Sequence, residues 1–181
     1  AMMRGMAAKH CAEERWKNVG IPQKNVYLWA NFLSMSKVIS LFHIVFATRG
    51  RVPALNDAIR ADFHRIMVHF VTELGCRLYC INSVRDHVHI LIDLSHTISL
   101  SMFMQNLKAQ SSAWIKRDGR SAQFAGWGKG YYGCTVSPSG IDPVIAYIEN
   151  QTQHHCICQF DSEIKSMCTK WGLTYHPNDL A

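Results

Sequence analysis

The sequence predicts an α+β domain in which an antiparallel sheet carries its helices packed on one face. Four short segments rich in β-branched and aromatic residues are separated by stretches whose apolar residues repeat at helical spacing. Of the 181 residues, 48% are hydrophobic and 18% are charged, which is the composition of a globular domain. A chain of this length buries about two-thirds of the surface that its unfolded state exposes, so one ordinary core suffices.

The first half of this pattern reads strand, helix, strand, strand. VISLFHIVFAT, residues 38–48, is rich in β-branched and aromatic residues, which is typical of a strand. Residues 54–74 carry apolar side chains at helical spacing and end at a glycine, so we expect a helix there. RLYCINSV at 77–84 and HVHILID at 87–93 predict two further strands joined by a short connection.

The second half reads helix, strand, helix, and a last helix. Residues 99–116 have one apolar side and predict a helix, and a glycine-rich loop leads from it to the fourth strand, YYGCTV at 131–136. Residues 142–154 carry a proline in the first turn, which favours a helix start, and 162–171 form the last expected helix. The order β-α-β-β-α-β is that of a ferredoxin-like sandwich.

Composition narrows the class of protein. No apolar run approaches the roughly 20 residues that span a bilayer. The seven cysteines are odd in number and irregularly spaced, which argues against a disulfide framework and favours reduced thiols. The net charge of +6 favours an anionic partner. We therefore expect a cytoplasmic protein with no membrane partner.

Basic and aromatic residues are interleaved between positions 94 and 141. A surface that binds single-stranded nucleic acid is expected to carry basic side chains that contact phosphates and aromatic rings on which unstacked nucleobases can stack. The alternative is that the aromatic rings belong to the core and the basic side chains are merely exposed to solvent. As contacts to the nucleic-acid backbone we expect four residues, with solvated surface as the alternative. They are Arg49, Arg51, Lys108 and Lys116.

Two histidines begin the strand expected at 87–93. Side chains alternate between the faces of a strand, so His87 and His89 share one face while Val88 and Ile90 point to the other. Residues two apart in a strand lie about 6 to 7 Å apart at the Cα atoms, close enough for both imidazoles to reach one cation. The alternative is a pair of surface histidines, since an isolated H-x-H motif also occurs by chance.

A later helix adds a hydroxyl group and an amide group. Tyr147 and Gln151 are four residues apart and therefore share a helical face. An amide oxygen beside two imidazoles leaves a hard divalent ion such as Mg²⁺ or Mn²⁺ with open positions for a phosphate oxygen. The alternative is that Tyr147 packs against the sheet and Gln151 is solvated.

In combination these motifs resemble those of a known family. FHIVFATRGR, DHVHILI, the LKAQSSAWIK helix, the GYYGCTVS strand and YIENQ follow one another in this chain. The same order is found in the TnpA-type or IS200-like transposases, single-tyrosine members of the HUH nuclease class. His87-Val88-His89 matches the family's His-hydrophobe-His motif, Tyr147 its catalytic tyrosine and Gln151 its third metal ligand.

The resemblance implies a chemistry and its partners. Tyr147 would attack a phosphodiester in single-stranded DNA, leaving a 5′-phosphotyrosine and a free 3′-hydroxyl, while Mg²⁺ or Mn²⁺ held by His87, His89 and Gln151 would orient the phosphate. The implied DNA partner is a hairpin at the ends of the mobile element. The family also implies a homodimer in which the tyrosine helix of one subunit can complete the metal site of the other.

Residues 1–34 stand apart from the resemblance, which begins at about Met35. They show no sustained hydrophobic period, and Met35 opens a segment that reads like a natural start. We expect an N-terminal extension over 1–34, poorly ordered unless it docks, and the catalytic domain over 35–181.

Other interpretations keep part of this pattern. A domesticated HUH endonuclease acting on repetitive palindromic DNA, or an HUH replication initiator, retains the nuclease chemistry. A non-catalytic ferredoxin-like nucleic-acid binder has no use for Tyr147 and Gln151 at these positions. We expect His43 to be a structural histidine with a satisfied partner. The crowded cluster of His154, His155, Cys156 and Cys158 lacks the paired spacing of a structural zinc site.

Overall fold

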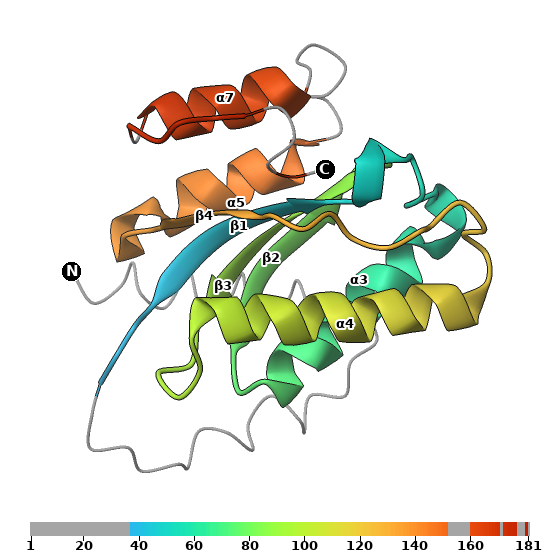
Figure 1. Ribbon diagram of the computed structural model, residues 1–181. Helices are drawn as coiled ribbons and strands as arrows, with labels where there is room; N and C mark the ends of the chain where they lie inside the picture. The colour runs from blue at the N-terminus through green and yellow to red at the C-terminus, as the bar shows by residue number, and fades with distance from the viewer. Residues whose placement is uncertain (1–36, 152–159, 171, 177–179, 181) are drawn as a thin grey trace. The chain divides into compact units, whose positions relative to one another are not determined.

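The computed structural model describes residues 37–151, 160–170, 172–176 and 180 (Figure 1). The chain divides into two compact units, Ala1–Val38 and Ile39–Ala181, and the elements below belong to the second. The expected boundary between an extension and a catalytic domain stays a prediction, because the first 36 residues lie outside the described part. None of the described helices is both long enough and apolar enough to cross a membrane.

A four-stranded sheet forms the centre of the described domain. Its strands are β1 (Leu41–Ala47), β2 (Arg77–Ser83), β3 (His87–Asp93) and β4 (Tyr132–Thr135). They lie in the spatial order β2-β3-β1-β4, and all three pairings are antiparallel. The predicted α+β class with a ferredoxin-like strand order is therefore confirmed.

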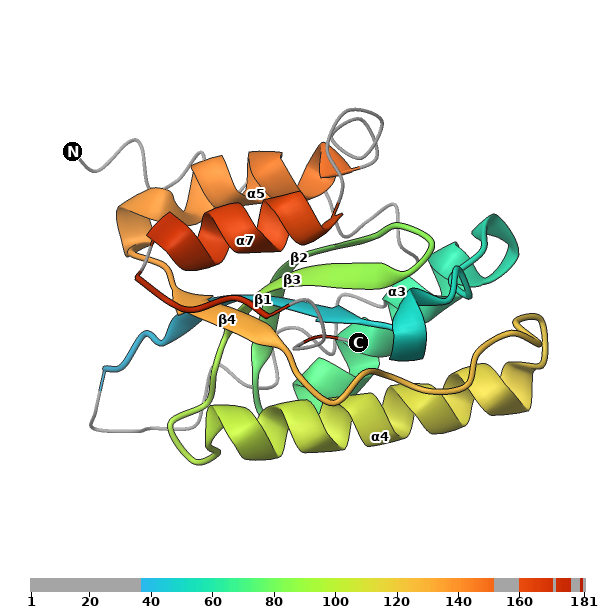
Figure 2. The same ribbon diagram turned by 45° about the horizontal axis from the view of Figure 1, so that its top comes forward.

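Helices α3 (Asp57–Glu73) and α4 (Leu100–Asp118) cover one face of the sheet (Figures 1 and 2). Asn56 caps α3 and Ser99 caps α4, each with a side-chain oxygen that accepts a backbone N–H of the first turn. The helices and strands bury a large apolar core between them, here called the α3–α4 core. Its members include Ile44, Phe46, Phe63, Ile90, Phe103 and Leu107.

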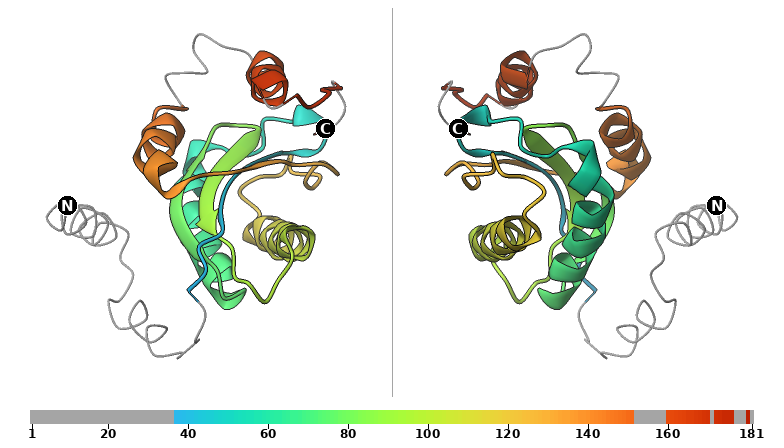
Figure 3. Two further views of the ribbon diagram at one scale, coloured as in Figure 1. Left: turned by 90° about the vertical axis from the view of Figure 1, so that its left-hand side faces the viewer. Right: turned by 90° about the vertical axis from the view of Figure 1, so that its right-hand side faces the viewer.

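Helices α5 (Ile141–Glu149) and α7 (Phe160–Lys170) cover the opposite face, and Figure 3 shows α4 and α5 on opposite sides of the sheet. Phe160 of α7 packs in one cluster with Val45 of β1, and Ile148 of α5 packs against β3. The expectation that the helices pack on one face therefore holds for α3 and α4 but not for α5 and α7. The physical reason is that β1 and β3 bury side chains on both faces, so both faces need a cover.

The tyrosine helix is shorter than the sequence predicts. A helix is expected over 142–154, whereas α5 ends at Glu149 and Asn150 forms its C-terminal cap. Gln151 follows this cap and is fully buried. Residues 152–159, which include the His154–Cys158 cluster, lie outside the described residues.

Candidate active site

Strand β3 directs both of its histidines to the face covered by α5 and α7. His87 and His89 are 1% and 0% exposed, and their ring centroids lie 5.2 Å apart. Val88 and Ile90 belong to the α3–α4 core on the other face. The predicted alternation is present, but the histidines are covered by helices rather than solvated, so each imidazole needs a polar partner.

His87 is held by the residue that precedes it. Its Nδ1 lies 2.7 Å from Oδ1 of Asp86, and Oδ2 of Asp86 accepts from Nη2 of Arg51 at 2.6 Å. Burial opposes ionisation of Asp86, but the hydrogen bonds from His87 and Arg51 hold its pKa below the usual value. An ionised carboxylate at Nδ1 keeps the proton there, so Nε2 of His87 is the ring nitrogen that could bind a metal ion.

Arg51, which holds Asp86, also contacts two residues of α7. Its guanidinium carbon lies 3.4 Å from the ring centroid of Phe160, and the same ring contacts the His87 ring at 4.4 Å between centroids. Arg51 further forms an ion pair with Asp161 at 3.5 Å. The side chain expected to contact DNA is therefore engaged with the site itself.

His89 is paired with a histidine of the neighbouring strand. Its Nδ1 lies 3.1 Å from Nε2 of His43, and the two rings stack with centroids 5.4 Å apart. Burial lowers the pKa of His43 to about 4, so His43 is a neutral imidazole with one donor and one acceptor nitrogen. The expected structural histidine does have a satisfied partner, but that partner is a histidine of the site.

Tyr147 lies on the side of α5 that faces these histidines. Its ring centroid is 5.9 Å from that of His43 and 6.0 Å from that of His89. Its hydroxyl donates a hydrogen bond to Oε1 of Glu163. The structure thus brings the predicted tyrosine to the predicted histidine pair, although they lie far apart in the chain.

Gln151 reaches the same carboxylate. Its Nε2 donates to Oε1 of Glu163 at 3.0 Å. Its own Oε1 is buried and has no hydrogen-bond partner within the part of the chain that the structure describes. A buried amide oxygen without a partner is costly, so this atom is suited to bind a cation.

Glu163 of α7 is the residue that the sequence interpretation missed. It is 4% exposed, and its Oε1 lies 3.7 Å from Nε2 of His89. The ligand atoms of His87, His89 and Glu163 all lie within 4.8 Å of one another. A signal was present in the sequence, because Glu163 falls on the apolar stripe that Phe160 and Ile164 form along α7.

The residues expected to bind DNA differ in their surroundings. Arg49 and Lys116 are exposed. The Nζ of Lys108 donates to the backbone carbonyls of Gly128 at 3.0 Å and Gly130 at 2.6 Å, and burial lowers its pKa to about 8. Lys108 therefore organises the glycine-rich loop.

The aromatic residues near this loop are mostly core residues. Phe124 and Trp127 are buried in the α3–α4 core, and the Trp127 Nε1 donates to Ser111 at 2.9 Å. For these two rings the structure supports the core interpretation over a stacking platform for nucleobases.

Sequence comparison relates this chain to a known family. The model of the family described as "Transposase IS200 like" matches residues 37–151. The IS200 transposases of Salmonella typhimurium and Salmonella typhi are each 29% identical to the chain over 119 residues, which cover 62% of this chain and 76% of theirs.

Solved structures share the fold. A Deinococcus radiodurans R1 protein described as a transposase has a TM-score of 0.51 at 24% identity, covering 64% of this chain and 94% of its own. A REP-associated tyrosine transposase bound to a REP hairpin has a TM-score of 0.51 at 12% identity, covering 81% of this chain and 89% of its own. With a family match that spans more than half of its length, the chain belongs to the IS200-like transposases.

Proposed function

We propose that this transposase cuts and rejoins single-stranded DNA, with Tyr147 as the nucleophile and a divalent cation held by His87, His89 and Gln151. The observation that carries the proposal is the meeting of a tyrosine hydroxyl and a buried histidine pair in one site built from β3 and α5. A positioned phenol beside a cation site is suited to covalent phosphoryl transfer.

In the proposed step the Tyr147 oxygen attacks the phosphorus of a phosphodiester. The new bond joins the tyrosine oxygen to phosphorus, and the bond between phosphorus and the 3′-oxygen breaks. The phenol loses its proton and the departing 3′-oxygen gains one, so the products are a 5′-phosphotyrosine and a free 3′-hydroxyl. The phosphotyrosine bond conserves the free energy of the cleaved phosphodiester. A 3′-hydroxyl from another strand can therefore reverse the step without ATP.

The donor set fits a hard or borderline divalent cation. His87, His89 and Gln151 are all buried, and the amide oxygen of Gln151 has no hydrogen-bond partner among the described residues. Mixed nitrogen and oxygen donors suit Mn²⁺, and Mg²⁺ where oxygen donors and water complete the shell. When bound, the cation supplies Lewis-acid polarisation and in-line orientation of the scissile phosphate.

The proposed partner is single-stranded DNA that carries a hairpin. The net charge of +6 and the exposed Arg49 and Lys116 support an anionic partner, and the fold is shared with a transposase bound to a REP hairpin. A homodimer that exchanges tyrosine helices remains a prediction. In the described chain Tyr147 lies beside the histidines of its own chain.

A covalent-adduct assay tests the proposal. The full chain is incubated with Mn²⁺ and a hairpin-bearing single strand from the flanks of its own gene, and a denaturing gel separates the adduct. We expect an adduct that EDTA and Tyr147→Phe abolish and that Tyr131→Phe preserves, because Tyr131 packs against the α3–α4 core. An undiminished adduct in Tyr147→Phe would contradict the assignment.

A second strand with a free 3′-hydroxyl separates the related functions. Joining of that strand to the cleaved DNA supports a strand-transferring transposase. Cleavage without joining supports a domesticated endonuclease that acts on palindromic DNA. Binding of DNA without any adduct supports a non-catalytic nucleic-acid-binding domain.

A further inference from the structure

Glu163 lies at the centre of the site, although it comes from a part of the chain that the family match does not include. The match ends at residue 151, and α7 begins at Phe160. The carboxylate nevertheless contacts Tyr147, Gln151 and His89. Helix α7 therefore adds a charged side chain to the residues that the family comparison covers.

The burial of this carboxylate requires a physical reason. An ionised carboxylate that is 4% exposed is costly unless a cation or several donors compensate for the lost hydration. One carboxylate oxygen of Glu163 lies within 4.8 Å of a ring nitrogen of His87 and of His89, which is the spacing of side chains that could share one metal ion. A divalent cation bound by these three side chains would compensate for the hydration that the carboxylate loses on burial.

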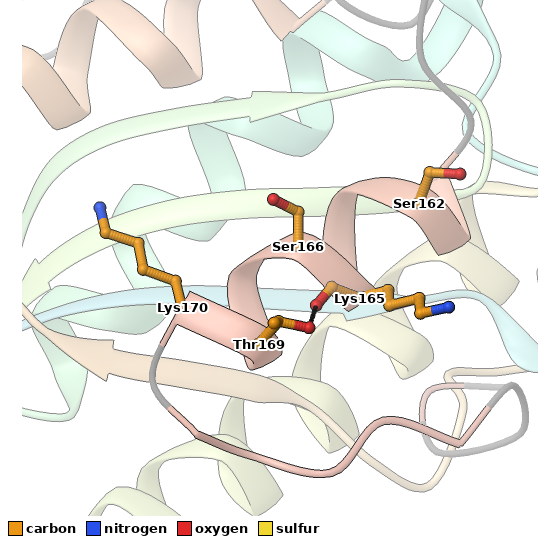
Figure 4. A pocket seen from close by; sticks show the side chains of 5 residues that line it. All are labelled: Ser162, Lys165, Ser166, Thr169 and Lys170. Carbon is orange, nitrogen blue, oxygen red and sulfur yellow. Dashed lines mark hydrogen bonds between the residues drawn. The ribbon is translucent and has the colours of Figure 1, made fainter.

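The distribution of residues around α7 supports a functional role for the inward position of Glu163. Its inner side packs Phe160 and Ile164 against the sheet, where an apolar residue in place of Glu163 would complete the stripe. Its outer side forms a shallow surface lined by residues with polar side chains (Figure 4). The residues of that surface are Ser162, Lys165, Ser166, Thr169 and Lys170. The helix thus has ample exposed positions for polar residues, yet one carboxylate is directed inward.

We propose that Glu163 is a fourth protein ligand of the divalent cation held by His87, His89 and Gln151, and that its carboxylate also positions the Tyr147 hydroxyl. This rests on the cation site of the proposed function. A carboxylate has two oxygens and can bind a cation while accepting the hydrogen bond of the phenol. One anionic ligand among neutral ones halves the charge of a bound dication and favours oxygen-preferring Mn²⁺ or Mg²⁺.

The ligand role is tested by metal binding in the absence of DNA. Calorimetric titration of the metal-free full chain with Mn²⁺ compares wild type, Glu163→Gln and the matched control Glu73→Gln, an exposed carboxylate at the end of α3. We expect Glu163→Gln to weaken Mn²⁺ binding at least about tenfold and Glu73→Gln to leave it unchanged. Equal Mn²⁺ affinity in wild type and Glu163→Gln would overturn the ligand assignment.

The positioning role is tested at saturating Mn²⁺. A glutamine oxygen can still accept the Tyr147 hydrogen bond, whereas alanine cannot. We therefore expect the single-turnover rate of adduct formation to fall at least about tenfold in Glu163→Ala and by less in Glu163→Gln. Equal rates in Glu163→Ala and wild type would overturn this role. If the alanine variant does not fold, a rate in Glu163→Gln between those of wild type and Tyr147→Phe supports the assignment.

The two experiments separate this proposal from the function on which it rests. If wild type forms no adduct but loses Mn²⁺ affinity on Glu163→Gln, the ligand assignment stands and the proposed cleavage fails. If wild type forms the adduct and neither Glu163 variant changes affinity or rate, the cleavage stands and the role of Glu163 fails.

Discussion

The two faces of the sheet are built on the same strands but have opposite character. The face under α3 and α4 is almost wholly apolar, with Phe63, Phe103 and Ile90 completely buried. The face under α5 and α7 buries His43, His89, Gln151 and Glu163. Burial of apolar surface stabilises the fold, whereas burial of polar groups costs free energy unless each group finds a partner. The face under α5 and α7 also buries apolar clusters around Phe160 and Ile148, so it combines stabilising packing with the polar groups of the site, whereas the face under α3 and α4 contributes mainly packing.

Removing a large ring from the α3–α4 core should have the largest effect on stability. Phe103 is 0% exposed, and Phe103→Ala leaves a cavity that should lower the free energy of unfolding by about 3–5 kcal/mol. Urea denaturation measures this loss. Mn²⁺ affinity of the folded fraction should not change, and a loss of metal affinity would show that the faces are not independent.

Acid should destabilise the fold through a half-buried histidine that lies outside the site, His64. His64 of α3 bonds to Ser83 at 2.8 Å, and burial lowers its pKa to about 4 from an unfolded value near 6.5. Between these values the unfolded chain binds a proton that the folded chain does not, so stability present above pH 6.5 is lost as the pH falls towards 4. The contribution of His64 is up to about 3 kcal/mol.

Denaturation curves between pH 7 and pH 4 check this expectation. His64→Leu should make the free energy of unfolding less dependent on pH in this range, because the unfolded variant no longer takes up that proton. An unchanged dependence in His64→Leu would mean that His64 is protonated in the folded chain or that other groups dominate.

On the face under α5 and α7, removing a charge should act in the opposite direction. In the absence of metal, Glu163→Gln removes a buried carboxylate while keeping its shape, so the free energy of unfolding should rise by on the order of 1 kcal/mol. Thermal denaturation in EDTA measures the change. A variant that is less stable than wild type would mean that the carboxylate is already compensated without a cation.

The smallest effect is expected at a side chain that belongs to neither face. Lys116 is exposed, so Lys116→Ala should leave stability unchanged and reduce the slope of log affinity for single-stranded DNA against log salt by about 0.7. Binding titrations at several salt concentrations give the slope. An unaltered slope would indicate that Lys116 contacts no phosphate.

Local sequence patterns predict the strands and the first two helices well. The helices expected over 54–74 and 99–116 are α3 and α4. Each begins at the residue that follows its N-terminal cap, which is Asn56 for α3 and Ser99 for α4. The alternation in HVHILID also predicts correctly which side chains share a face. Periodicity and capping act within a few residues, so the sequence carries them directly.

The rest of the site depends on contacts between distant segments. His43 meets His89 because β1 and β3 pair with Val45 opposite His89, a register that neither strand specifies alone. Glu163 falls on the apolar stripe of its helix, but the side chains that it contacts are determined only when α7 packs over the sheet. Local patterns identified the tyrosine and the histidine pair but could not identify the residues that surround them.

The Phe160 ring of α7 contacts both Arg51 and His87. The packing of α7 on the sheet is therefore linked to the position of the histidine pair. If a cation binds more tightly when α7 is docked, thermodynamic reciprocity requires that the bound cation hold α7 in place by the same free energy. Metal concentration would then set the fraction of molecules with a docked C-terminal helix.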